Sequence, residues 1–230
     1  LDQLSRPWTQ STAPRKFRRF PTEGKARLCI GFDAMHYFIT GRAFVQPDAA
    51  QTYSRDQFDT LFTFRHMADP TQKLTIQKEP DFPYDDWDVI NHSANGFRLS
   101  RSAAGQKMAH GQLLAVCPHD GEHFLLASAT WLMQEQEGGL IAGLAVIPGM
   151  PQGVGVRFVH AHPALSEPFT QAFLLPPVPA IGEESSLVLP LGTYQASQIM
   201  EVAGDSIWQV RLKHILARGT DYERVSFERI

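Results

Sequence analysis

After Pro70 the chain is a succession of short apolar segments of strand length, each followed by a turn rich in Gly, Pro, Asn or Asp. Segments of this length at regular spacing are typical of antiparallel β-barrels and β-sandwiches. The turn at residues 118–121 contains an Asp-Gly pair, which is a strong hairpin signal. The expected strands are residues 73–78, 87–91, 96–100, 112–117, 124–134, 140–147 and 153–159.

The segments before Pro70 carry weaker β signals. Residues 1–14 have no periodicity and predict an irregular lead-in. Residues 25–30 predict a strand that can continue to Phe38. Residues 54–67 predict a helix, because apolar side chains recur there at helical spacing behind Ser54, a suitable N-cap.

The C-terminal part predicts two further units. Residues 163–186 contain five prolines and predict a linker that lies over the surface. Residues 187–230 return to a β pattern but are too few for a core of their own, so we expect them to pack on another part of the protein.

Charge is distributed unevenly along the chain. The formal net charge of the 230 residues is −3, which argues against a cationic nucleic-acid binder, and no DNA partner is expected. Residues 1–30, however, carry seven Lys and Arg against two acidic residues. A basic arm beside an acidic body either keeps the protein soluble or binds a compact anion. The sequence leaves both interpretations open.

Cellular context is indicated only by absences in the sequence. No apolar run approaches the roughly 20 residues that a membrane-spanning helix needs, so no membrane span is expected. The two cysteines, Cys29 and Cys117, do not form a disulfide framework and are compatible with a reducing, cytoplasmic compartment. The chain begins with Leu1, and we therefore expect it to be a piece of a longer protein with an upstream domain.

Two short motifs stand next to expected strands. The first is Arg-Lys-Phe-Arg-Arg, in which Arg15 and Arg19 form an Arg-x-x-x-Arg pair just before residues 25–30. The second is Asn91-x-Ser93-x-x-Gly96, in the turn between two strands. Together, and in this order, they resemble the PilZ domain, a bacterial receptor for the second messenger cyclic di-GMP. Residues 153–158 resemble the closing strand of the PilZ barrel.

The resemblance implies a fold, a ligand and a site. The fold would be all-β, an antiparallel six- to seven-stranded PilZ-like barrel with a helical insertion and a small C-terminal β extension. The expected division is a basic arm at 1–20, a barrel at 21–162 with an insertion at about 33–84, a Pro-rich linker at 163–186 and the extension at 187–230. The ligand would be cyclic di-GMP, bound by Arg15, Arg19, Asn91, Ser93 and Gly96, with Lys16, Arg18 and His92 as further candidate contacts.

The chemistry of these residue types suits that ligand, which carries two phosphates and two guanines. Arginine pairs bidentately with phosphate oxygens or with guanine O6 and N7, and its planar face stacks on a base. Asn91 offers amide donors and an acceptor, and Ser93 offers a hydroxyl. Gly96 can adopt the positive φ of a tight turn and lets a ligand approach the backbone. The motifs lie 72 positions apart, but loop closure costs grow slowly with length.

Other chemistries find less support. Cys117, His119 and His123 share a hairpin turn and lack the two spaced pairs of a zinc site, so no metal is expected. The sequence has no nucleophile elbow and no nucleotide-binding glycine motif, and neither an enzyme nor a cofactor is expected. Binding would change the contacts of the arm with a partner protein or the upstream domain. The alternative is a degenerate PilZ-like interaction module that binds no nucleotide.

Overall fold

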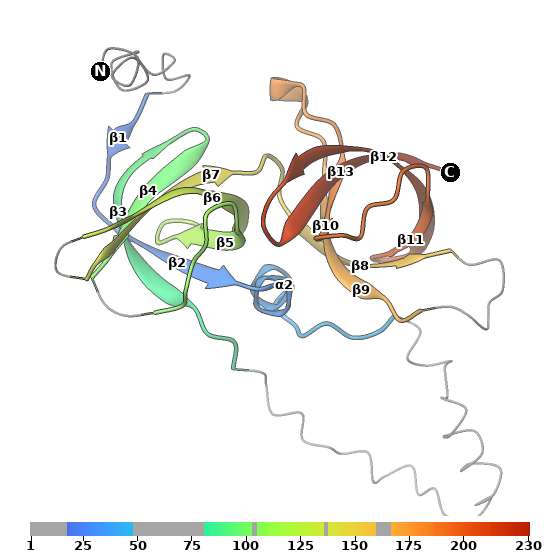
Figure 1. Cartoon of the computed structure of the whole chain (residues 1–230), viewed down its shortest axis with the longest axis horizontal. Helices are drawn as coiled ribbons and strands as arrows, with labels where there is room; N and C mark the ends of the chain where they lie inside the picture. Colours follow the sequence, from blue (N-terminus) through green and yellow to red (C-terminus); the bar gives the residue numbers. More distant parts are fainter. Residues whose placement is uncertain (1–17, 48–80, 103–104, 136–137, 160–166) are drawn as a thin grey trace, which may run out of the picture.

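The computed structural model describes residues 18–47, 81–102, 105–135, 138–159 and 167–230. These residues form two closed β-barrels that lie side by side, each of six antiparallel strands, with one α-helix between them (Figure 1). The expected helix at 54–67 and the expected strand at 73–78 lie outside the described residues. The all-β class and the antiparallel barrel predicted from the sequence are confirmed.

The first barrel lies within the barrel predicted at residues 21–162, and the first strand of its ring is the one predicted at 25–30. Its ring runs in the order β3-β2-β5-β6-β7-β4, and β4 pairs again with β3 to close it. A short strand, β1, is added to β3 outside the ring. The bounds are β1 (Phe20–Pro21), β2 (Lys25–Ile30), β3 (Asp85–Ser93), β4 (Gly96–Arg101), β5 (Leu113–Pro118), β6 (Leu125–Gln134) and β7 (Leu140–Val146).

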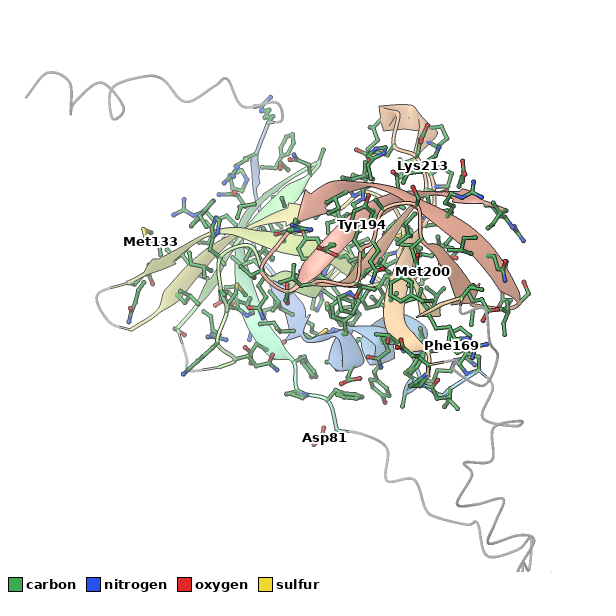
Figure 2. The ribbon with its side chains drawn as sticks, turned by 45° about the vertical axis from the view of Figure 1, so that its right-hand side comes forward. Asp81, Met133, Phe169, Tyr194, Met200 and Lys213 are labelled. Atoms are coloured by element: carbon green, nitrogen blue, oxygen red, sulfur yellow. The ribbon has the colours of Figure 1, made fainter. Side chains whose placement is uncertain are left out.

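The second barrel is built entirely from residues after β7. Its ring runs in the order β10-β13-β12-β11-β8-β9 and closes between β9 and β10, whose hairpin holds a short 3-10 helix, η3 (Pro179–Ile181). Met200 lies in its core, and the Tyr194 hydroxyl donates to the Lys213 carbonyl oxygen at 2.7 Å (Figure 2). The bounds are β8 (Gln152–Phe158), β9 (Thr170–Leu175), β10 (Ser186–Pro190), β11 (Ile199–Ala203), β12 (Ile207–Arg218) and β13 (Tyr222–Arg229).

The second barrel corrects three sequence-based expectations. Residues 153–158 do not close the first barrel, because β8 pairs with β9 and β11 of the second. The expected linker at 163–186 contains a core strand, β9. The expected small extension at 187–230 is most of a complete barrel. Its residues alone cannot enclose a core, and the addition of β8 and β9 supplies the missing strands.

The helix α2 (Phe32–Thr40) replaces the continuation of the first strand that we expected up to Phe38. Gly31 ends β2 at a φ of 92°, and Gly41 ends the helix in the left-handed conformation at a φ of 73°. Both angles suit glycine and are unfavourable for other residues. Among the described residues, no helix has the length and apolar character that crossing a membrane requires.

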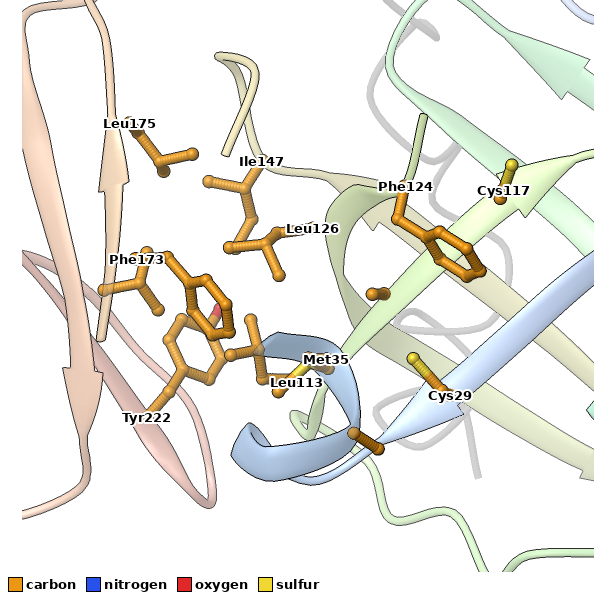
Figure 3. Close-up of a cluster of buried hydrophobic side chains, with 13 residues drawn as sticks. Cys29, Met35, Leu113, Cys117, Phe124, Leu126, Ile147, Phe173, Leu175 and Tyr222 are labelled. Atoms are coloured by element: carbon orange, nitrogen blue, oxygen red, sulfur yellow. The ribbon is translucent and has the colours of Figure 1, made fainter. Parts of the chain in front are cut away.

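A single apolar cluster joins the two barrels (Figure 3). Leu113 and Leu126 come from the first barrel, Met35 from α2, and Phe173 and Tyr222 from the second barrel. All five side chains are buried. Because burial of large apolar side chains is the main favourable term in such an interface, this cluster holds the barrels against each other.

Backbone groups add a polar contact at the edge of this cluster. The Thr220 N–H donates to the Gly111 carbonyl oxygen at 3.0 Å, and the Leu113 N–H donates to Oδ1 of Asp221 at 2.8 Å. The barrels approach so closely here that a Cβ on Gly219 would lie 2.2 Å from the Gly111 carbonyl oxygen. The loop between β12 and β13 therefore docks on the first barrel by hydrogen bonds as well as by apolar contact.

Candidate functional site

The two sequence motifs meet where β1 runs along β3. Phe20 is paired with His92 and Pro21 with Asn91. This register brings Arg19 to Asn91, and its Nη1 donates to the Asn91 Oδ1 at 3.2 Å although the residues are 72 positions apart. Arg15 and Lys16 lie outside the described residues. Of the expected arginine pair, Arg19 is the one that lies within the described residues, and it contacts Asn91.

A β-bulge determines how Asn91 and Ser93 are presented. Val89 is paired with Leu99 and Asn91 with Arg98, so Ile90 is an extra residue in β3. Bulges of this kind bend a strand and redirect the side chains beyond them. Residues two apart on a strand share a face, so Asn91 and Ser93 point to the same side, and His92 points to the other.

Ser93 is held across the hairpin turn that follows. Its hydroxyl lies 3.1 Å from Oδ1 of Asn95 and 3.4 Å from the Gly96 carbonyl oxygen, and it can donate to either. These contacts orient the hydroxyl on the face of β3 that also carries the Asn91 side chain. A polar ligand group at this face would find an amide and a hydroxyl.

Gly96 is required for a different reason from the one that we expected. Its φ does not lie in the left-handed region. Instead, a Cβ at this position would lie 2.2 Å from the carbonyl oxygen of Leu144 on β7. The glycine therefore permits the close approach of β4 and β7 at the foot of the turn.

His92 engages the chain just after the arm rather than Asn91 or Ser93. Its Nδ1 lies 2.7 Å from the hydroxyl oxygen of Thr22, and its ring centroid is 6.2 Å from that of Phe20 and 6.4 Å from that of Phe97. Arg18 packs over the ring of Phe20, with its guanidinium carbon 5.6 Å from the centroid. No motif in the sequence singles out Thr22 or Phe20.

A cavity of about 310 Å³ opens on the His92 side of β3. Its lining combines the charged side chains of Glu23, Lys25 and Asp120 with the polar side chains of Thr22, His92 and His119. The Lys25 carbonyl oxygen accepts a hydrogen bond of 2.8 Å from the His119 N–H, which fixes one wall. Sequence reasoning missed this cavity, because its lining comes from segments that are distant in the chain.

Two buried titratable side chains, Cys29 and His36, have shifted pKa values. Burial raises the pKa of the Cys29 thiol to about 12, against the opposing effect of a backbone hydrogen bond to Ala115, so the thiol stays protonated. Burial also lowers the pKa of His36 on α2. Within the described ranges, no three His, Cys, Asp or Glu side chains converge in a way that could hold a metal ion.

Two family models match the chain at its two ends. Residues 1–62 match the model described as the middle PilZ domain of the cyclic-di-GMP receptor FimW. Residues 154–230 match the model described as the FimW C-terminal β-barrel domain. The second match coincides with the strands β8 to β13.

A curated relative and solved structures were also found. Cyclic-di-GMP receptor FimW of Pseudomonas aeruginosa is 25% identical over 240 residues, which cover 88% of this chain and 39% of the relative. The chain thus spans well under half of that protein. Two structures of MrkH, one of them named as from K. pneumonia, are 9% and 8% identical, cover 64% and 65% of this chain and 74% of theirs, and have TM-scores of 0.23. These TM-scores are too low to support an argument.

The sequence matches agree with the architecture. The strands β1 and β2, which belong to the same sheet as Asn91 and Ser93, lie within the segment matched to a PilZ domain, and the second barrel is the segment matched to the FimW β-barrel. These matches confirm the predicted resemblance to the PilZ family: residues 1–62 are similar to the PilZ domain of FimW, and residues 154–230 are similar to its C-terminal β-barrel domain.

Proposed function

We propose that this chain is a cyclic di-GMP-binding receptor module. Arg15 and Arg19 would bind from the arm, and Asn91, Ser93 and Gly96 would form the barrel side of the site. The observation that carries the proposal is the contact of Arg19 with Asn91, because it joins the two halves of the motif. The printed name of the relative, a cyclic-di-GMP receptor, supports the same ligand.

The electrostatics at Arg19 favour an anionic ligand. Arg19 forms no ion pair with any residue that the structure describes, and its hydrogen-bond acceptor is the neutral Asn91 amide. A phosphate would replace this neutral acceptor with a charged one, so the hydrogen bond would become an ion pair, which arginine can make bidentately. The released Asn91 amide would then be available to a guanine edge or a second phosphate oxygen.

We further propose that the module acts by binding and not by catalysis. Ligand binding would change the contacts of the arm with a partner protein or an upstream domain, in the cytoplasm and without DNA. Among the described residues, the arm meets the barrel at the β1–β3 pairing and at the Arg19–Asn91 hydrogen bond, so a ligand at Arg19 would act directly on the point where the arm leaves the barrel.

Calorimetry with cyclic di-GMP tests the site. We expect Arg19→Ala and Arg15→Ala each to weaken binding at least tenfold, which corresponds to about 1.4 kcal/mol. Ser93→Ala should weaken it less, because one neutral hydrogen bond is lost. Arg211→Ala is a matched control, since Arg211 pairs with Glu228 on the second barrel.

The outcomes separate the two proposed functions, a cyclic di-GMP receptor and an interaction module that binds no nucleotide. Equal affinity in all five proteins would remove the site assignment and leave the ligand bound elsewhere. No binding by the wild type would instead support the alternative, an interaction module that has lost the nucleotide. A thermal melt of each variant without ligand shows whether the substitution has disturbed the barrel itself.

A further inference from the structure

The backbone pairing between the arm and the barrel is too small to hold the arm alone. β1 has two residues, and one of them is Pro21, which has no N–H to donate to the ladder. Isolated strand pairs even of ordinary length are marginally stable in water. Phe20 is 51% exposed, so it buries little apolar surface. Side-chain contacts must therefore contribute to the placement of Arg19.

Thr22 and His92 supply such a contact immediately after β1. The Thr22 hydroxyl and the His92 Nδ1 share a hydrogen bond of 2.7 Å, and Thr22 is half-buried. The His92 ring is flanked by Phe20 on one side and Phe97 on the other. His92 thus belongs to the barrel strand β3, and Thr22 lies three residues after Arg19 in the chain.

We propose that Thr22 and His92 are positioning residues of the ligand site. Their contact holds the chain along β3 so that Arg19 stands next to Asn91 before the ligand arrives. This inference rests on the proposed function. Binding sites whose groups are already ordered avoid the entropic cost of ordering them during association, and they bind more tightly for that reason.

A direct contact between His92 and the ligand is a less consistent interpretation. His92 points to the opposite side of β3 from Asn91 and Ser93, as alternate strand residues do. Its Nδ1 is already engaged by Thr22. The histidine acts on the site through the arm.

Substitution of Thr22 tests the proposal with closely matched side chains. Thr22→Val keeps the shape and removes the hydroxyl, and we expect about a fivefold loss of cyclic di-GMP affinity, the effect of one typical hydrogen bond. Thr22→Ser restores the hydroxyl and should bind within about twofold of the wild type. His92→Phe keeps a ring between Phe20 and Phe97 and should match Thr22→Val, and the double variant should lose no more than either single one.

Hydrogen exchange on the ligand-free protein gives an independent readout. In Thr22→Val the amides of Arg19, Phe20 and residue 22 should exchange faster than in the wild type, while the rest of the barrel is unchanged. Wild-type affinity in Thr22→Val, with Arg19→Ala weakened, would overturn this inference and leave the proposed function intact. Unchanged exchange would overturn it even if the wild type binds no ligand. Loss of binding in Thr22→Ser equal to that in Thr22→Val would also contradict it.

Discussion

At Gly96 the backbones of β4 and β7 approach so closely that no side chain fits between them. Gly96→Ala would place a methyl group 2.2 Å from the Leu144 carbonyl oxygen, and a backbone atom cannot yield as a flexible side chain can. We expect Gly96→Ala to reduce the free energy of unfolding by about 1–3 kcal/mol, as overpacking does elsewhere. Denaturant titration of the two proteins measures the difference.

Gly24→Ala is the matched control for that substitution. Gly24 immediately precedes β2, as Gly96 stands at the start of β4, but a Cβ on Gly24 would meet no atom within 4 Å, and its φ is not left-handed. The free energy of unfolding should stay within about 0.5 kcal/mol of the wild type. Equal losses in both variants would show that the Leu144 contact is not the reason for the glycine at position 96.

At the scale of single residues, the resemblance to the PilZ motifs singled out Arg19, Asn91 and Ser93, and the structure brings Arg19 to Asn91. Their residue types suit a phosphate and a guanine. Thr22 was not singled out, because a lone threonine acquires its role only from the pairing of distant segments. The reason for Gly96 was also hidden, since Leu144 is 48 positions away and meets it only in the closed barrel.

At the scale of elements, α2 shows why the segment up to Phe38 was expected to be a strand. Its apolar residues lie almost continuously along the sequence, and such short runs do not distinguish a strand from a buried helix. The helix is selected by packing. Gly153 on β8 makes room for it, because a Cβ there would lie 2.5 Å from Cγ2 of Thr40 and 2.8 Å from Nε2 of His36.

The burial of His36 in this packing makes the stability of the protein depend on pH. Burial lowers the pKa of His36 below its ordinary 6.5; the charge of Arg42 adds to this, and a backbone hydrogen bond to Arg42 and the charge of Asp33 oppose it. The unfolded chain therefore binds the proton more tightly than the folded one. The stabilising contribution is complete above pH 6.5 and is lost as the pH falls through the lowered pKa.

A comparison with His36→Gln isolates this effect. Glutamine keeps a polar side chain at the position and does not titrate. We expect the melting temperature of the wild type to fall more than that of His36→Gln when the pH is lowered from 7 to 5. An equal fall in melting temperature for the two proteins would mean that protonation of His36 does not destabilise the folded protein.

At the scale of the whole molecule, the strands were more predictable than their assembly. Most of β8 lay within an expected strand, and β12 and β13 lie in the segment for which a β pattern was expected, yet the barrel that they form was not expected. Strand pairing depends on contacts between distant segments, such as β8 with β11, and local patterns do not encode them. The prolines at 176–179 were a poor guide as well, because they lie between two core strands.

The polar contact between the barrels leads to a prediction for Asp221. Asp221→Ala would leave the buried Leu113 N–H without its acceptor, and such a loss costs about 1–3 kcal/mol in the free energy of unfolding. Asp221→Asn keeps an acceptor oxygen in place and should be close to the wild type. Denaturant titrations at neutral pH compare the three proteins. An unchanged free energy of unfolding in Asp221→Ala would show that water replaces the carboxylate as the acceptor.

The pH dependence of the Asp221 variants has a defined sign. Burial raises the pKa of Asp221 above its ordinary 3.8, against the effect of the Leu113 N–H. The folded protein thus binds the proton more tightly than the unfolded chain. The wild type should lose stability relative to Asp221→Asn as the pH rises from 3.8 through the raised pKa, and a constant difference would contradict this.

The apolar cluster of Figure 3 has a practical consequence for anyone who shortens this chain. A cut between β7 and β8 would leave Leu113 and Leu126 on one fragment, and Phe173 and Tyr222 on the other, each facing water. Exposed patches of that kind cause aggregation. The pair of barrels is accordingly the smallest fragment worth expressing, and the two halves, if made separately, should re-associate when they are produced together.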